Sequence, residues 1–105
     1  MTKRENILNE IKRIVNEKEP SAKIYLYGSR ARGNEKIDSD WDLLILISED
    51  KVSHEMEQKI IYPLYDLEFD TGEVISPMVY SENEWNGKYR LTPFYQTVMN
   101  ESILL

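Results

Sequence analysis

Residues 24–47 constrain the fold of this chain more than any other stretch. They place two apolar runs, Ile24–Tyr27 and Leu43–Ile47, on either side of a polar connection. The first run is short and rich in β-branched and aromatic residues, and the second is aliphatic throughout, so both predict strands. Gly28 and Ser29 come directly after the first run. Because glycine allows a sharp turn and a close approach to a ligand, the pattern predicts a strand, a turn and a buried strand.

The turn has the features of an anion-binding segment. The hydroxyl and amide of Ser29 can both donate to a phosphate oxygen, and Ser29 can cap the residues that follow. The next residues, Arg30-Ala31-Arg32, suit a helical turn whose first N–H groups point toward an anion. Gly28, Ser29, Arg30 and Arg32 are therefore the candidate nucleotide-binding residues.

Two aspartates, Asp40 and Asp42, stand at the start of the second run. Because side chains at positions i and i+2 of a strand share a face, these carboxylates point the same way, with Cα atoms roughly 6.5–7 Å apart. Neighbouring carboxylates repel each other, and burying them without partners is costly. A divalent cation relieves both effects, and an all-oxygen ligand set suits Mg²⁺. We predict that Asp40 and Asp42 bind a metal ion.

The segment from Gly28 to Leu43 reads G-S-R-A-R-G-N-E-K-I-D-S-D-W-D-L. The Gly-Ser pair, ten residues and then Asp-x-Asp resemble the DNA polymerase β-like nucleotidyltransferases. More narrowly, A-R-G at residues 31–33 and S-D-x-D-L at residues 39–43 look like the small bacterial minimal nucleotidyltransferases. The resemblance implies that the Gly-Ser pair holds the phosphates of ATP or another nucleoside triphosphate. It also implies that Asp40 and Asp42 are catalytic and hold Mg²⁺, with two ions expected when the nucleotide is bound.

The resemblance also implies a reaction and a partner. Members of the family transfer a nucleoside monophosphate, here AMP from ATP, to a hydroxyl acceptor. Minimal members commonly act with a HEPN-type toxin, as the antitoxin of the pair, and some modify a tyrosine of that toxin. The alternative is a nucleotidyltransferase-fold module with weak or no activity that neutralises a partner by binding it.

A third carboxylate normally completes the site in this family, on the strand after the second long helix, and often serves as the general base. If that helix ends near Gly72, the equivalent position is Ser76, which is not an acid. Glu68, Asp70 and Glu73 lie nearby, and a different strand assignment would bring Glu68 or Asp70 to the site. Asp70 is kept as a candidate catalytic residue.

Helix periodicity and caps predict the elements around this core. Apolar spacing predicts a helix over residues 2–17, capped by Thr2. A second helix starts after Ser53 and ends near Gly72, and Pro63 predicts a kink or two short helices there. The alternative for this region is a strand over residues 67–70.

The last third of the chain predicts one more strand and two helical segments. Residues 73–80 read as a strand, which Pro77 demotes to a sheet edge or a bulge. Ser81 caps a short helical turn. Thr92-Pro93 starts the last helix, whose apolar side extends to Ile103. The terminal Leu104-Leu105 is expected to pack on this domain or to meet a partner.

Length and composition limit the fold class and the kinds of partner that this chain can have. The 105 residues predict one domain of the α+β (mixed α/β) class, with a small mixed sheet of three to four strands flanked by helices. The net charge of −6 argues against an extended nucleic-acid footprint but not against a small nucleotide. There is no cysteine, no apolar run that spans a bilayer and no signal peptide pattern. We expect a cytoplasmic protein that does not bind membranes, with a homo-oligomer as an open possibility.

Overall fold

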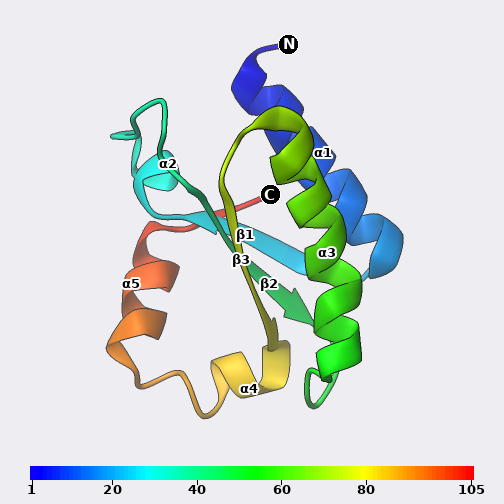
Figure 1. Ribbon diagram of the computed structural model, residues 1–105. Helices are drawn as coiled ribbons and strands as arrows, with labels where there is room; N and C mark the ends of the chain where they lie inside the picture. The colour runs from blue at the N-terminus through cyan, green and yellow to red at the C-terminus, as the bar shows by residue number, and fades with distance from the viewer.

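The computed structural model describes all 105 residues and contains a four-stranded mixed sheet with helices on both faces (Figure 1). The strand order is β3-β2-β1-β4; β2 is parallel to β3 and antiparallel to β1, and β4 is antiparallel to β1. The α+β class and the small mixed sheet are therefore confirmed. In chain order the elements are α1 (Lys3–Lys18), β1 (Lys23–Tyr27), α2 (Ser29–Arg32), β2 (Trp41–Ile47), α3 (His54–Thr71), β3 (Ile75–Ser81), α4 (Glu82–Asn86), α5 (Pro93–Glu101) and β4 (Ile103–Leu104).

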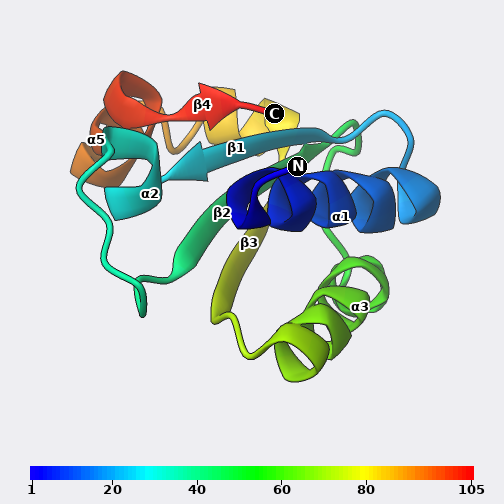
Figure 2. The ribbon, with the colours of Figure 1, turned by 90° about the horizontal axis from the view of Figure 1, so that it is seen from above.

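The two faces of the sheet carry separate hydrophobic clusters. Helices α1 and α3 lie over one face, and α4 and α5 lie over the other (Figure 2). Strand β2 supplies both clusters: Trp41, Leu43 and Ile45 belong to the α1–α3 side, and Leu44 and Leu46 belong to the α4–α5 side. Because successive strand residues point to opposite faces, a central strand that is buried on both sides needs an unbroken apolar run.

The predicted helix starts are confirmed by their caps. In each case a side-chain oxygen accepts a hydrogen bond from the backbone N–H three residues further on, at Thr2, Ser53, Ser81 and Thr92. Pro93 is the first residue of α5, where its missing N–H costs nothing. None of the helices combines the length and the apolar character that crossing a membrane requires.

The region around Pro63 differs from prediction. One helix, α3, runs through Pro63, so the expectation of two short helices is wrong. The helix continues to Gly72, which adopts φ 76° as its C-cap, so the alternative strand over residues 67–70 is also wrong. Packing against the core offsets the hydrogen bond that a proline cannot donate. Three residues of α3 provide this packing: Ile60, Leu64 and Leu67.

The two edges of the sheet are formed differently. Strand β3 is an edge strand, as Pro77 predicted, and starts two residues later than expected. At the other edge the last helix ends at Glu101, so placing Ile103 in that helix is wrong. Ile103 and Leu104 instead pair with β1, and the Leu105 N–H donates to the Ile24 carbonyl at 2.9 Å. The C-terminus thus packs on its own domain and covers an edge that would otherwise expose unpaired backbone groups.

Candidate active site

The predicted phosphate-binding turn lies where β1 ends. Gly28 has φ 76°, a conformation that favours glycine because other residues meet steric repulsion there. Ser29 then begins α2, a single helical turn that ends at Gly33. Since the first N–H groups of a helical turn have no partner within it, the backbone here presents donors suited to an anion.

Asp42 lies directly against this turn. It is the register partner of Tyr27 across β1 and β2. A Cβ atom on residue 28 would collide with the Asp42 Oδ2 and would lie 3.2 Å from its Cγ. Only glycine therefore leaves room for the carboxylate. The connection between the two strands folds back so that the Gly-Ser turn and the second aspartate share one site.

Asp40 and Asp42 meet a hydroxyl from the next strand. The Ser76 Oγ donates to the Asp40 Oδ2 at 3.2 Å, and Ser76 is the register partner of Asp42. Burial raises the pKa of Asp42, and the charges of Asp40 and Glu101 raise it further. The ionised form of Asp42 is thus disfavoured by its surroundings, and a bound cation would reverse this. The all-oxygen donor set fits Mg²⁺.

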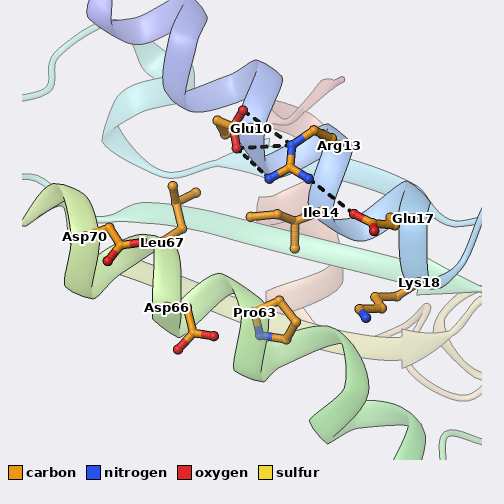
Figure 3. Close-up of a pocket in the computed structure, with 9 residues that line it drawn as sticks. All are labelled: Glu10, Arg13, Ile14, Glu17, Lys18, Pro63, Asp66, Leu67 and Asp70. Carbon is orange, nitrogen blue, oxygen red and sulfur yellow. Dashed lines mark hydrogen bonds and ion pairs between the residues drawn. The ribbon is translucent and has the colours of Figure 1, made fainter.

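The acids considered for a third carboxylate lie elsewhere. Glu68 Oε1 accepts a hydrogen bond of 2.8 Å from the Ile75 N–H at the start of β3. Asp70 lines a hollow between α1 and α3, where Figure 3 shows it beside Leu67 and opposite α1. The structure therefore does not bring Asp70 to the aspartate pair. No three His, Cys, Asp or Glu side chains are grouped so that they could together hold a metal ion.

Glu73 and Arg30 lie on the opposite face of the sheet, against Trp41. The Trp41 Nε1 donates to the Glu73 Oε2 at 3.1 Å, and the Arg30 guanidinium carbon lies 4.1 Å from the centre of the Trp41 ring. The Arg30 Nε donates to the Ser39 carbonyl at 3.0 Å. Arg30, predicted to bind nucleotide, is therefore only 8% exposed and holds the connection that precedes Asp40.

Arg32 stays beside the site and has a partner that the sequence did not indicate. Its Nη1 lies 2.6 Å from the Glu101 Oε2 at the end of α5. The positive charge of Arg32 lowers the pKa of Asp42 and so partly offsets the effects that raise it. Glu101 is 69 residues away in sequence. It reaches the site because β4, which follows it, pairs with β1.

Tyr27 forms an aromatic wall next to Asp42. Its Oη donates to the Met78 Sδ at 3.3 Å, and the Phe94 ring packs edge-on against it with 5.9 Å between ring centres. Burial, together with the charge of Asp42, raises the pKa of Tyr27 to about 12. The phenol therefore stays protonated and supplies an apolar ring and a neutral hydroxyl, not a base.

The aspartate pair can be reached from solvent, because Asp40 is exposed and Asp42 is only partly buried. None of the hollows of the molecule is lined by Gly28, Ser29, Asp40 or Asp42. The hollow in Figure 3 lies between α1 and α3, where Arg13 is already paired with acidic residues of its own helix. A surface of this shape leaves the aspartate pair accessible to a group carried by a large molecule.

The turn, the aspartate pair and the mixed sheet define a class of protein. A sequence model of the nucleotidyltransferase domain family matches residues 8–92. The chain therefore belongs to the nucleotidyltransferase domain family, as the resemblance predicted.

Two solved structures share this fold. One is described as a toxin-antitoxin with AMP-PNP; it is 18% identical, with a TM-score of 0.65, and the match covers 91% of this chain and 69% of that chain. The other is described as a mutant of the toxin-antitoxin MntA-HpeT; it is 19% identical, with a TM-score of 0.61, and covers 93% and 70%. At these identities the likeness shows the fold alone. A comparison with curated proteins found no match.

Proposed function

We propose that this protein transfers AMP from ATP to a hydroxyl group of a partner protein. The observation that supports this most strongly is the contact between Gly28 and Asp42. It joins a phosphate-binding turn and a pair of carboxylates on one surface. Nucleotidyl transfer needs both parts, because the leaving phosphates must be held and the charge that develops on them must be neutralised.

The donor set fits a divalent metal ion. Asp40 and Asp42 offer carboxylate oxygens on one side of the sheet, and burial with like charge nearby makes the bare Asp42 carboxylate unfavourable. Mg²⁺ held by these two aspartates would neutralise phosphate charge and align the reacting oxygens. Gly28 and Ser29 would hold the β- and γ-phosphates, and Arg32 would add positive charge beside them.

The proposed step conserves atoms and charge. The acceptor oxygen forms a bond to the α-phosphorus of ATP, and the bond from this phosphorus to the oxygen that bridges to the β-phosphate breaks. Pyrophosphate leaves on the side of Gly28 and Ser29. The hydroxyl proton passes to water, which reaches this open site, because Ser76 and the protonated Tyr27 are poor bases.

The acceptor is proposed to be a protein of a toxin–antitoxin pair. An open site admits a hydroxyl on a large molecule, and both structural neighbours are described as toxin-antitoxin structures, one of them with the ATP analogue AMP-PNP. We extend this to a HEPN-type partner, which modification would inactivate. This chain would then act as the antitoxin.

A second function is favoured by one observation. The residue of β3 that pairs with Asp42 is Ser76, which is not an acid, so only the carboxylates of Asp40 and Asp42 would be available to hold a metal ion. In this alternative the protein neutralises its partner by contact, with slow or no transfer. Asp40→Asn and Asp42→Asn would then leave neutralisation intact, whereas removal of α5 and β4 would abolish it.

Labelled ATP tests the proposal. The purified protein is incubated with Mg²⁺, an extract of its host and ATP that is radiolabelled in the α-phosphate. We expect a labelled protein with the α-label and none above background with ATP labelled in the γ-phosphate, because AMP and not phosphate is transferred. The Asp40→Asn/Asp42→Asn variant should label nothing. Equal labelling by this variant would rule out the proposed site.

A further inference from the structure

The functional positions lie in a row across the sheet. Gly28 and Ser29 follow β1, Asp42 lies on β2, and Ser76 lies on β3. The strand order places β2 between the other two. The aspartate pair therefore has the phosphate-binding turn on one side and Ser76 on the other, with the Ser76 hydroxyl 3.2 Å from Asp40.

This order of the strands determines the side from which an acceptor enters. The inference rests on the proposed function. In phosphoryl and nucleotidyl transfer the attacking and leaving oxygens lie on opposite sides of the phosphorus, roughly in line. Pyrophosphate held by Gly28 and Ser29 leaves on the β1 side. The attacking hydroxyl must then approach over β3, beside Ser76.

The approach side is the β3 edge of the sheet, next to α3. Strand β3 is bonded to β2 on one side only, and Figure 2 shows α3 next to this edge. A hollow of about 270 Å³ lies between them. It is lined by Glu57 and Ile61 of α3 and by Pro77, Met78, Val79 and Tyr80 of β3. Pro77 has no N–H to donate, so this edge is poorly suited to adding another strand.

The solvent face of α3 extends this surface with exposed aromatic residues. Tyr62, Tyr65 and Phe69 repeat at helical spacing and are 56%, 47% and 89% exposed. Val74, in the connection to β3, is 46% exposed. Tyr62 and Tyr65 line a second hollow together with Ile61, which also lines the first. Single exposed apolar residues are ordinary, but three large ones on one helix, with a fourth in its connection to β3, indicate an interaction surface.

The charge of this region selects the kind of partner. On the part of α3 that lies by these two hollows the exposed acids are Glu55 and Glu57, and Glu57 lines both hollows. A nucleic acid would be repelled by these carboxylates. A second copy of the chain, itself with net charge −6, would be repelled as well. A protein surface with both basic and apolar residues is complementary.

We propose that the acceptor protein docks on the α3–β3 surface, which comprises Tyr62, Tyr65, Phe69, Val74, Pro77 and Met78. The acceptor contacts it with a positively charged, partly apolar surface and extends its hydroxyl past Ser76 to the nucleotide. The exposed aromatic residues of α3 lie outside the nucleotide site, so they can be changed without altering it.

The test uses the acceptor that α-labelled ATP marks in the host extract, after purification of that protein. Transfer rates are measured against acceptor and against ATP concentration for Tyr65→Ser/Phe69→Ser. We expect the KM for the acceptor to rise by about tenfold or more, since removing two aromatic anchors weakens docking. The KM for ATP should not change. Added salt should also raise the acceptor KM, because the charges that attract the partner are exposed.

Leu91→Ser is the matched control, because Leu91 is 91% exposed, as Phe69 is, but lies between α4 and α5. It should leave both KM values unchanged, and melting temperatures should show all variants folded. An unchanged acceptor KM in the double variant would overturn the docking proposal while leaving the proposed function intact. Label on nuclease-sensitive material or on this chain itself would also overturn it, in favour of a nucleic acid or a second copy. With no labelled species at all, the proposed function fails and the docking proposal fails with it.

Discussion

Glu73 and Asp42 are two carboxylates on opposite faces of one sheet, and their surroundings act on them in opposite ways. Glu73 is 7% exposed and accepts hydrogen bonds from Lys3 and Trp41, with Arg30 close by; these partners hold its pKa below the ordinary value. Asp42 faces the other side, where burial and the charge of Asp40 raise its pKa. The fold gives Glu73 hydrogen-bond partners that favour its ionised form, whereas the surroundings of Asp42 disfavour its ionised form.

Strand β2 contributes one residue to the core and the next residue to the candidate site. Trp41 and Asp42 are neighbours in sequence, but strand alternation sends them to opposite faces. Trp41 enters the α1–α3 core and is held by Glu73, which fixes the start of β2. Asp42 is thereby placed against Gly28. Glu73, which has partners, thus stabilises the position of Asp42, which has none from the core.

The largest expected effect is on catalysis. Asp42→Asn should lower the rate of AMP transfer by about 10³-fold, because a carboxylate that holds the charge-neutralising ion is lost. Glu73→Gln should lower the rate far less, since its side chain lies on the far face and the glutamine oxygen can still accept the hydrogen bond from the Trp41 Nε1. Pyrophosphate release measures both. Equal losses of rate in the two variants would show that Asp42 has no role in transfer that Glu73 lacks.

Gly28→Ala should abolish nucleotide binding and destabilise the fold. The new methyl group meets the Asp42 carboxylate, and φ 76° is itself unfavourable for alanine. Gly33→Ala is a matched control, since Gly33 has φ 81° but no atom within 4 Å of its Cβ position. It should cost about 1–2 kcal/mol from the backbone alone and leave binding intact. Loss of binding in both variants would assign the effect to backbone strain.

Glu73→Gln should lower the free energy of unfolding by about 1–3 kcal/mol at neutral pH, because charged hydrogen-bond partners are lost. Because the pKa of Glu73 is lower in the folded protein than its ordinary value of 4.5, the ionised side chain stabilises the fold at pH values above 4.5. This stabilisation is lost as the pH falls through the folded-state pKa. The difference between wild type and variant should therefore shrink as the pH falls below 4.5. Urea unfolding at several pH values measures it, and a constant difference would contradict the assignment.

The smallest expected effect is a gain in stability, opposite in sign to the effect of Glu73→Gln. Asp42→Asn should raise the free energy of unfolding at neutral pH, by less than about 1 kcal/mol for a partly exposed group. Because the pKa of Asp42 is higher in the folded protein than its ordinary value of 3.8, ionisation of Asp42 destabilises the fold. The stability gained by Asp42→Asn is therefore full above the folded-state pKa of Asp42 and disappears as the pH falls to 3.8. Urea unfolding of this variant beside Glu73→Gln shows whether the two signs differ. A lower free energy of unfolding for Asp42→Asn would mean that the Asp42 carboxylate stabilises the fold, as Glu73 does.

Much of the site follows from residues 24–47 because its parts are local. The Gly-Ser turn, the strand alternation of Asp40 and Asp42 and the apolar run of β2 are all contained in one stretch of chain. The stop at Gly72 was also readable, and it correctly led to Ser76 as the position beside Asp42.

The remaining parts depend on contacts that no local pattern encodes. Arg30 and Arg32 are equivalent in sequence, but a helical turn sends one to Trp41 and the other to Glu101. Glu101 itself arrives through the pairing of β4 with β1. A two-residue strand at the end of a helical pattern gives no periodic signal, so neither β4 nor its consequence for the site was predicted.

Calorimetric titration of ATP into the purified protein, with and without Mg²⁺, tests most directly whether the turn and the aspartate pair form a nucleotide site. Wild type and Glu73→Gln should bind ATP only with Mg²⁺, and Asp40→Asn/Asp42→Asn should not bind it under either condition. Binding by folded Asp40→Asn/Asp42→Asn that equals the wild type, or binding that ignores Mg²⁺, would contradict the assignment of the nucleotide site to these residues.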